Sequence, residues 1–403
     1  MTRLATLTYA LALISCEIPE CAQPAYHRAE CRVAAENELA HLVTANGVEV
    51  RFQDPATEDT DAWVATGVVH EGAGGAVQAR VAGVGDFRIS LHGPSSGTLP
   101  LRLELDNVDP RIPAFDDQVE AFGLSRVLAL DVGRLKVLEG RLPESLCETG
   151  FTLTAVGDIQ TNPIQGRRTI AALHDELDRA DGDDRPLLGM LFLGDVTEAS
   201  QVEELTTALD IFRSAPVPVA VVPGNHDVYD TDDAAFNRVF GPGTMAFEVC
   251  DAHVTLLDTG SGDLAPSVEG RLPELLGDGS QELLIAGMHH PPYAGWTGGG
   301  WTAEDQSQHL LALLAARDAD LVLAGHVHER IEFEDAPVPE VVVGTAGANQ
   351  ANTDPDYGYL RIEFDPETGL SWCFVEVPAP GSDGIRDGSK QPFSCQAPFD
   401  GGG

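Results

Sequence analysis

Two different patterns of apolar and polar residues divide the chain into two regions. From about Val48 to Leu142, short runs that alternate apolar with polar residues are separated by Gly, Pro, Asp and Asn. This pattern predicts six or seven strands of a small β-sandwich. Examples are VEVRF at 48–52, WVATGVVH at 63–70, FRISLHG at 87–93 and LPLRLELD at 99–106. We find no motif for chemistry in this region.

Beyond Cys147 the apolar runs become nearly continuous and alternate with helical patterns. Strands are expected at 151–157 and 187–194, each followed by an amphipathic helix, at 167–180 and 203–214. Further strands are expected at 217–224, 253–258, 282–288, 320–325, 340–347 and 358–364. Repeated strand and helix units predict an α/β domain in which helices pack on a sheet.

The N-terminus has the features of an export signal. Arg3 precedes an apolar run from Leu4 to Ile14, which is too short to span a bilayer. The tetrad LISC, ending at Cys16, resembles the lipobox of bacterial lipoproteins and implies that Cys16 becomes the lipid-carrying first residue. A plain signal peptide cleaved elsewhere is the alternative. We expect an exported protein of the cell envelope or outer surface, anchored to the membrane through this lipid alone.

These patterns give a set of domain boundaries. We predict a signal peptide at 1–15, a tether at 16–45, a β-rich domain at 46–145, an α/β domain at 150–378 and a C-terminal tail at 379–403. CRVAAENELAHLV, at 31–43, is expected to form a short helix within the tether. Apart from Cys16, six cysteines remain, which suits disulfides in an oxidising compartment and leaves 15 connectivities open.

The charge of the chain restricts its partners. A formal net charge of −40, with 64 acidic and 24 basic side chains, excludes a surface for duplex nucleic acid, because such a surface needs clustered Lys and Arg. Solubility or adaptation to salt explains this acidity, and collection of cations is the functional alternative. An anionic substrate then needs local positive charge, for which bound metal ions are a source.

Side chains that bind metals recur directly after the apolar strands of the α/β domain. The carboxyl ends of such strands are where ligands sit in open α/β sheets. Each motif alone is a weak signal: a Gly-Asp pair is often a turn, and the HHPP segment serves equally well as a rigid loop. The ordered set is specific, and it comprises GDIQ at 157–160, GDVTE at 194–198, GNHD at 224–227, HHPP at 289–292 and GHVH at 325–328.

In this order the five motifs resemble the signature blocks of the calcineurin-like metallophosphoesterases, over about Phe151 to Val377. The resemblance implies a four-layer αββα sandwich, here preceded by the small all-β domain. It assigns one metal ion to Asp158, Gln160, Asp195 and His328, and the other to Asp195, Asn225, His289 and His326. Asp195 is then the bridging ligand. His290 becomes a neighbour of the site, His226 the acid over the leaving group, and Asp227 the residue that orients the ring of His226.

The reaction that the resemblance implies is hydrolysis of phosphate esters by a metal-bound hydroxide. Two divalent ions hold the phosphate oxygens and lower the pKa of a bound water, and His226 protonates the leaving alkoxide. Gln160 stands where the family's usual ligand is histidine. Three interpretations follow: a variant metal site, a site that has lost its activity, or a chance match to the motif. Its amide oxygen favours Mn²⁺ or Mg²⁺, with Zn²⁺ and Fe²⁺ as alternatives.

We therefore predict a metal-dependent phosphomonoesterase or phosphodiesterase acting on a small-molecule phosphate ester or another phosphorylated substrate. The sequence leaves the substrate, the oligomeric state and the choice between monoester and diester open. Trp296 and Trp301, after the fourth motif, are interpreted either as stacking platforms for a substrate or as loop anchors. The alternative function is a catalytically inactive surface or adhesion protein of the same fold that binds divalent cations.

Overall fold

The computed structural model describes residues 29–53, 66–113, 115, 118–183, 185–229, 234–293, 300–333, 335–350 and 357–379. Within these residues, α-helices run over α1 (Ala29–Leu39), α2 (Pro163–Gly182), α3 (Val202–Phe212), α4 (Ala235–Phe240), α5 (Pro266–Leu275) and α6 (Glu304–Ala315). Short 3₁₀ helices occur at η3 (Ala73–Gly75), η4 (Glu144–Leu146) and η5 (Asn225–Val228).

The strands of the first half of the chain are β1 (His41–Val43), β2 (Glu49–Gln53), β3 (Gly67–Glu71), β4 (Val77–Val81), β5 (Phe87–His92), β6 (Leu99–Asp106), β7 (Gln118–Phe122), β8 (Ser125–Val132) and β9 (Lys136–Gly140). They form two sheets, in the orders β1-β2-β5-β9 and β3-β4-β6-β8-β7. One apolar core, with Phe52, Phe87 and Leu103 among its buried members, lies between these sheets. The predicted sandwich is therefore present, but with nine strands instead of six or seven.

The strands of the second half are β10 (Phe151–Val156), β11 (Leu187–Phe192), β12 (Val219–Val221), β13 (Met245–Val249), β14 (Ala252–Leu257), β15 (Leu283–Met288), β16 (Leu321–Ala324), β17 (Arg330–Phe333), β18 (Glu340–Val343), β19 (Gly358–Asp365) and β20 (Gly369–Glu376). They build two mixed sheets, in the orders β12-β11-β10-β19-β20 and β13-β14-β15-β16-β18-β17. Strands β10, β11 and β12 are parallel to one another, as are β14, β15, β16 and β18.

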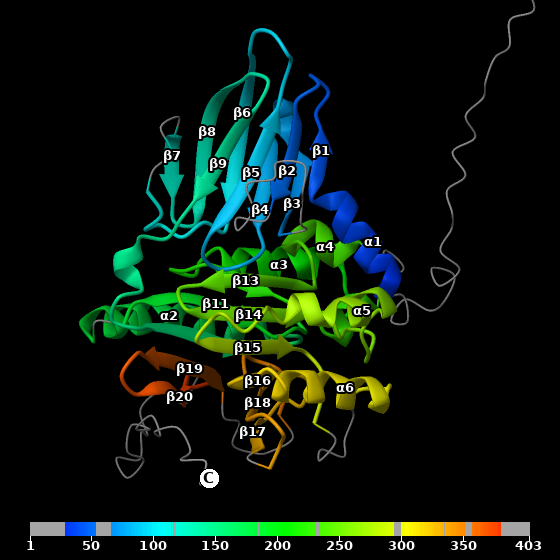
Figure 1. Ribbon diagram of the computed structural model, residues 1–403, viewed down its shortest axis with the longest axis vertical. Helices are drawn as coiled ribbons and strands as arrows, with labels where there is room; N and C mark the ends of the chain where they lie inside the picture. The colour runs from blue at the N-terminus through cyan, green and yellow to red at the C-terminus, as the bar shows by residue number, and fades with distance from the viewer. Residues whose placement is uncertain are drawn as a thin grey trace, which may run out of the picture.

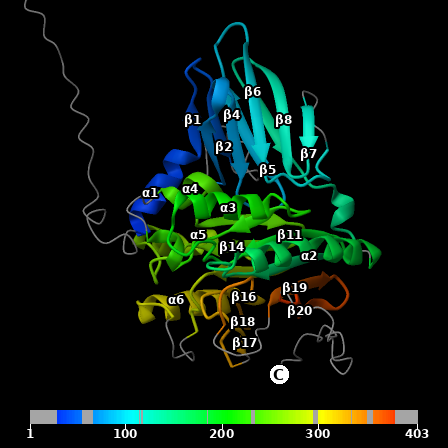
Figure 2. The same ribbon diagram turned by 180° about the vertical axis from the view of Figure 1, so that it is seen from behind.

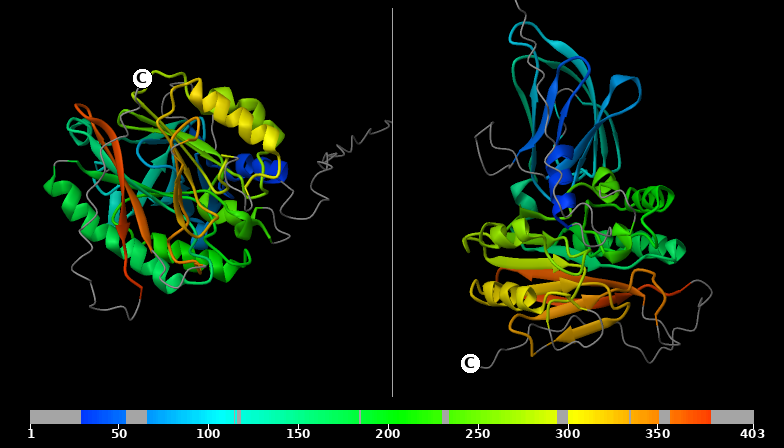
Figure 3. Two further views of the ribbon diagram at one scale, coloured as in Figure 1. Left: turned by 90° about the horizontal axis from the view of Figure 1, so that it is seen from below. Right: turned by 90° about the vertical axis from the view of Figure 1, so that its right-hand side faces the viewer.

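These two sheets lie face to face between helices, as the left view of Figure 3 shows with α2 in green and α6 in yellow on opposite outer sides. The alternation along β15 explains the stacking. Ile285 belongs to the core shared by the two sheets, whereas Leu284 and Ala286 point the other way and pack with α5 and α6. Because both faces of this sheet are covered at its centre, the central strands β15 and β16 are apolar throughout. The four-layer αββα fold, preceded by a β-rich region, confirms the predicted fold class.

The helix α1 lies along the junction of the two halves (Figures 1 and 2). Its Arg32 is buried and donates to Asp258 from Nε at 2.7 Å and from Nη2 at 3.1 Å. Glu36, also buried, accepts from the side chain of Asn237 and from the backbone N–H of Gly243. The predicted helix within residues 16–45 is therefore packed against the α/β half, which the interpretation of this segment as a tether did not foresee.

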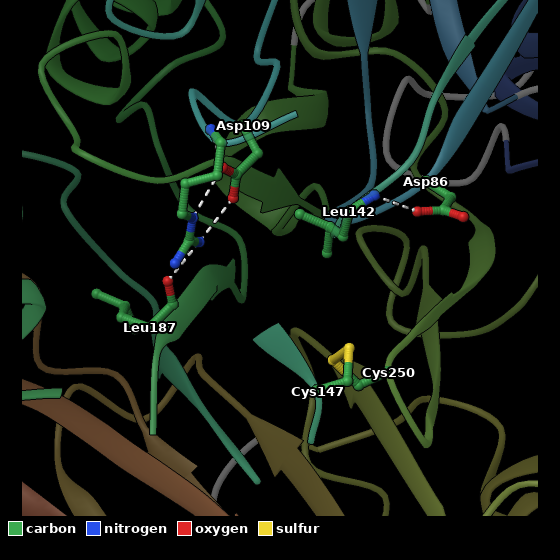
Figure 4. The surroundings of a disulfide bond; sticks show 7 residues. Asp86, Asp109, Leu142, Cys147, Leu187 and Cys250 are labelled. Atoms are coloured by element: carbon green, nitrogen blue, oxygen red, sulfur yellow. Dashed lines mark hydrogen bonds and ion pairs between the residues drawn. A yellow bond between two sulfur atoms is a disulfide. The ribbon is translucent and has the colours of Figure 1, made fainter. Parts of the chain in front are cut away.

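Covalent and polar links also join the halves, as Figure 4 shows. A disulfide connects Cys147, just before β10, to Cys250 in the turn between β13 and β14. Arg111 donates to the backbone oxygen of Leu187, at the start of β11, at 2.7 Å. The bond from the backbone N–H of Leu142 to Asp86, at 2.9 Å, lies within the first half and fixes the segment that follows β9. Cys31 and Cys373 are also disulfide-bonded. The prediction of disulfides is thereby confirmed, while Cys16, Cys21 and Cys395 lie outside the described residues.

Within the part of the chain that the structure describes, no helix has the length and apolar character needed to cross a membrane. The predicted signal peptide and the C-terminal tail from 380 onward fall outside that part.

Candidate metal centre

Five loops meet at one end of the two central sheets. Each leaves the carboxyl end of a parallel strand: β10, β11 and β12 in one sheet, and β15 and β16 in the other. These loops carry the seven metal ligands predicted from the sequence, namely Asp158, Gln160, Asp195, Asn225, His289, His326 and His328. The geometry brings them together in two adjoining groups.

The first group consists of Asp158, Asp195 and His328, whose possible ligand atoms all lie within 4.8 Å of one another. The Nε2 atom of His328 is 3.4 Å from Oδ1 of Asp158. Its Nδ1 is 3.0 Å from the backbone oxygen of Asn349, so a proton on Nδ1 fixes the ring with Nε2 turned toward the carboxylate. Both aspartates are fully or almost fully buried.

The second group is built around the side chain of Asn225. Its Oδ1 atom is 3.1 Å from Nε2 of His289 and 3.1 Å from Nδ1 of His326. Nδ1 of His289 is 2.8 Å from the backbone oxygen of Leu193, which favours a proton there and leaves Nε2 facing the group. Nε2 of His289 also lies 3.4 Å from Oδ2 of Asp195, so Asp195 borders both groups.

Gln160 contacts the same shared residue. Its side-chain nitrogen donates to Oδ2 of Asp195, and its backbone N–H donates to the backbone oxygen of Asp195 at 3.1 Å. Because an amide presents its oxygen when turned by half a rotation, this side chain is within reach to offer an oxygen ligand at the first group. The position is thus integrated into the site, as a variant ligand requires.

The buried charges of the site influence one another. Burial raises the pKa of Asp158 well above its usual range, against the opposing charge of His289. Burial alone would also raise the pKa of Asp195. The interactions with His289 and His226 have the larger opposite effect and hold the pKa of Asp195 below its usual value. Burial favours neutral His289, yet the carboxylates of Asp195 and Asp158 raise its pKa to about 9. This cluster of side chains therefore favours bound positive charge.

The backbone is strained where the predicted ligands sit. Of the nine described residues other than glycine with positive φ, five are Asp158, Gln160, Asp195, His326 and His328. Such conformations cost free energy and cluster at functional sites. Glycines provide the space around the carboxylates: a Cβ on Gly325 would lie 2.6 Å from Oδ2 of Asp158, and a Cβ on Gly344 would lie 2.8 Å from the same atom.

His226 lies beside this centre without belonging to either group. Its backbone N–H donates to Oδ1 of Asp195 at 2.9 Å. Nδ1 of its ring is 2.7 Å from the backbone oxygen of Glu198 and 3.7 Å from the Glu198 carboxylate. A proton on Nδ1 is therefore well held, and among the described residues the opposite nitrogen, Nε2, has no hydrogen-bond partner.

Asp227 does not orient the ring of His226, which corrects the role taken over from the resemblance. Its carboxylate accepts from the backbone N–H groups of Gly224, Val196 and Thr197 and from the hydroxyl of Thr197. The two loops that carry Asp195 and Asn225 are joined by these bonds. Burial and the nearby Asp195 raise the pKa of Asp227 to about 6. Asp227 is thus a positioning residue for the loops, and Glu198 holds the ring.

Thr259, which the sequence interpretation missed, supports two of the histidines. The hydroxyl of Thr259 accepts from the backbone N–H groups of His289 and His290, at 3.1 and 3.0 Å. His290 is buried, and its ring lies 4.3 Å from that of His326, so it also groups with the second set as a possible ligand. Trp301 donates from Nε1 to the backbone oxygen of His290 at 2.9 Å, which makes it a loop anchor. Trp296 lies outside the described residues.

The donors fit two divalent cations. Two carboxylates, two amide side chains and three imidazoles converge, which is a set that Mn²⁺, Mg²⁺, Zn²⁺ and Fe²⁺ all accept. With His289 neutral and protonated on Nδ1, its Nε2 and the Oδ1 atom of Asn225 are both acceptors 3.1 Å apart. Two facing acceptors require a proton or a cation between them, so the second group is shaped for positive charge.

Comparison with known proteins gives a consistent picture. Residues 151–330 match the sequence model of the calcineurin-like phosphoesterase family. The match begins with β10 and ends at the first residue of β17, so it covers all five loops. Calcineurin-like phosphoesterases use a dinuclear metal centre. No curated protein matches the chain.

Solved structures resemble the chain at low sequence identity. The structure of PhoD is 11% identical over 74% of this chain and 86% of that chain, with a TM-score of 0.49. A dimetal phosphatase from Danio rerio is 13% identical over 57% of this chain and 98% of that chain, with a TM-score of 0.46. GAP50, the anchor in the inner membrane complex of Plasmodium, is 14% identical over 57% of this chain and 85% of that chain, with a TM-score of 0.43.

Proposed function

We propose that the chain is a metal-dependent phosphoesterase that hydrolyses phosphate monoesters or diesters at the site around Asp195. The observation that carries this proposal is the position of Asp195 between the two groups of possible ligands, one with Asp158 and His328 and one with His289. A carboxylate shared by two cation sites is the arrangement that two-metal hydrolysis needs.

The seven side chains Asp158, Gln160, Asp195, Asn225, His289, His326 and His328 would hold the ions. When bound, two divalent ions supply the positive charge that holds a phosphate and make a water acidic enough to attack phosphorus at neutral pH. This accounts for a protein of net charge −40 that acts on an anion. The strained loops and the hydrogen bonds of Asp227 keep the ligands in place before substrate arrives.

His226 acts as the general acid in this proposal. The Glu198 oxygen holds Nδ1, and Nε2 delivers its proton to the alkoxide that leaves phosphorus. The carboxylate of Glu198 also lies near the ring, 3.7 Å from Nδ1.

Gln160 directs the choice of metal. An amide oxygen is a harder and weaker donor than imidazole, so we propose Mn²⁺ or Mg²⁺ as the working ions. Gln160→His supplies an imidazole at the same position, and the variant is expected to retain or gain activity with Zn²⁺. Metal content and hydrolysis, measured for both proteins in parallel, test this assignment.

The function is tested by hydrolysis of aryl phosphate monoesters and diesters, with and without Mn²⁺, on protein first treated with a chelator. We expect no turnover after chelation and recovery with Mn²⁺, and the relative rates on the two esters identify the substrate class. Full activity of the chelated protein would overturn the site. Binding of ions without hydrolysis of either ester would instead support the inactive cation-binding alternative.

We also propose that the protein is exported and anchored through a lipid on Cys16. The sequence LISC and the apolar run before it support this proposal. Several acyl chains on one cysteine hold a protein firmly on a membrane, whereas a single chain does so only marginally. Cys16→Ser is therefore expected to release the protein or block its processing. Soluble wild-type protein that begins at another residue would contradict the anchor.

A further inference from the structure

Three exposed apolar side chains follow three of the loops that carry the candidate metal ligands. Among the described residues, six large hydrophobic side chains are exposed, and three of these are Ile164, Val202 and Tyr229. They come shortly after Gln160, Asp195 and Asn225 respectively. Exposed apolar groups gathered at a site commonly mark a place where a ligand binds.

The fold brings these loops to one edge. Strands β10, β11 and β12 are parallel neighbours, so the segments that leave their carboxyl ends start side by side. The backbone N–H of Tyr229 donates to the hydroxyl of Ser200 at 2.9 Å, and Val202 follows Ser200 by two residues. The hydroxyl of Ser200 in turn donates to the backbone oxygen of His226 at 2.8 Å. Ser200 thus ties the segment that leads into α3, whose first residue is Val202, to Tyr229 and to the backbone of His226.

Tyr229 contacts the proposed chemistry directly. Its ring centroid is 4.9 Å from that of His226, and its hydroxyl accepts from the side-chain nitrogen of Asn225 at 2.9 Å. Nearly half of the residue's surface remains exposed, at 46%. Since His226 is the proposed proton donor to the leaving group, the free part of the tyrosine ring lies where that group departs.

The charges around this edge select against anionic groups. The carboxylate of Glu198 lies 3.7 Å from the ring of His226, and Glu203, in the first turn of α3 next to Val202, is exposed. A leaving group with further phosphates or carboxylates would meet these negative charges, whereas an uncharged apolar group would cover the exposed ring and the valine.

We propose that Tyr229 and Val202 form a leaving-group subsite that selects phosphate esters of uncharged, apolar alcohols or phenols. This inference rests on the proposed function, because it uses the same site and the same general acid. It narrows the substrate class from phosphate esters in general to those with an apolar organic group.

The test is calorimetric titration of ethylphosphonate and hexylphosphonate into the full chain with Mn²⁺. A phosphonate is not hydrolysed, so the measurement does not depend on turnover. The two probes carry the same head group, and only the apolar length differs. We expect hexylphosphonate to bind about tenfold more tightly than ethylphosphonate, because added methylenes in an apolar contact give preferences of this size.

Two variants and one control locate the preference. Val202→Asp and Tyr229→Ser are each expected to bring the two affinities within about twofold, since they remove apolar surface from the subsite. Phe122→Ser changes another exposed apolar residue, on β7 in the N-terminal sandwich, and is expected to leave the tenfold ratio intact.

The outcomes separate the inference from the function on which it rests. Equal affinity for both phosphonates in the wild type, binding of neither, or a ratio that survives Val202→Asp and Tyr229→Ser would overturn the subsite. A tenfold ratio that both variants abolish supports it. If that ratio is found while no phosphate ester is hydrolysed, the proposed function fails and the apolar subsite stands.

Discussion

Gly224→Ala tests how closely the site is packed around Asp195. The backbone of Gly224, with φ −98° and ψ −176°, is extended and accessible to any residue, so the substitution adds a methyl group without conformational strain. That methyl carbon would lie 2.5 Å from the backbone nitrogen of Asp195, 2.8 Å from Cγ of its carboxylate, and closer still to Oδ1. Contacts this short are not tolerated, so Asp195 must shift. The shift is costly because Asp195 is buried and its carboxylate accepts from the backbone N–H of His226.

The magnitude follows from this overlap. Overpacking of a well-filled site costs about 1–3 kcal/mol of unfolding free energy. Displacement of a catalytic group by about 1 Å costs roughly 10²-fold in rate. We therefore expect Gly224→Ala to remain folded, to bind Mn²⁺ at least about tenfold more weakly, and to lose about 10²-fold in hydrolysis of an aryl phosphate.

The matched control is Gly270→Ala in α5. Apart from its chain neighbours and the backbone of its own helix, no described atom lies within 4 Å of a Cβ at Gly270. Alanine is favoured over glycine in a helix by about 1 kcal/mol. This variant should match or exceed the wild type in stability, with unchanged metal content and rate. Thermal unfolding, metal analysis and steady-state kinetics on both variants compare their stability, metal content and rate with those of the wild type. Gly224→Ala with wild-type metal content and rate would refute the packing argument.

Three further predictions concern buried or catalytic groups. Burial raises the pKa of Glu340 from 4.5 to about 8, so the folded state binds the proton more tightly than the unfolded state, and stability falls as pH rises from about 4.5 to 8. Glu340→Gln should remove a loss of up to a few kcal/mol at pH 9, measured as a smaller fall in Tm between pH 5 and pH 9; an unchanged fall contradicts this reasoning. Arg32→Met leaves Asp258 buried without its partner and should lower the unfolding free energy in urea by about 3–5 kcal/mol, with partial recovery on adding Asp258→Asn; a loss below about 1 kcal/mol would show the ion pair to be dispensable. His226→Ala should slow hydrolysis of alkyl phosphates by roughly 10² to 10⁴-fold while sparing nitrophenyl esters and metal content, whereas equal losses on both esters with loss of metal would assign His226 a structural role.

The sequence predicted the central strands well and the edges poorly. All eight strands expected in the α/β half are present, from β10 to β19. The strands that it missed, β13, β17 and β20, all lie at the edge of a sheet. A central strand is covered on both faces and reads as an apolar run, but β17 has the sequence RIEF and no fully buried residue. Edge strands therefore lack the signal on which the prediction depended.

The same limit applies to the site. The positions of Asp158, Asp195 and the histidines follow from strand ends, because parallel strands deliver their loops to one edge. The partner of a side chain is set by the path of the loops, which no spacing encodes. The sequence therefore assigns Asp227 to the ring of His226, whereas the structure shows it bonded to backbone N–H groups. The contacts of Tyr229 and Thr259 with the site have no sequence signal.

The helix α1 shows a related failure. Its pattern of apolar residues is weak, and its buried face includes the charged Arg32 and Glu36. A charged residue reads as solvent-exposed unless its partner is known, and the partner Asp258 lies 226 positions further along the chain. Only the folded structure shows that α1 is part of the packed molecule.

The central claim is that Asp195 is shared by two cations, and titration of the chelated protein with Mn²⁺, followed by electron paramagnetic resonance, tests it most directly. Two Mn²⁺ ions bridged by one carboxylate are magnetically coupled, so the wild type should take up two equivalents and develop the multiline signal of a coupled pair. Asp195→Asn, which weakens the shared ligand, should lose that signal. Uptake of a single ion, or a coupled signal that persists unchanged in Asp195→Asn, would contradict the account.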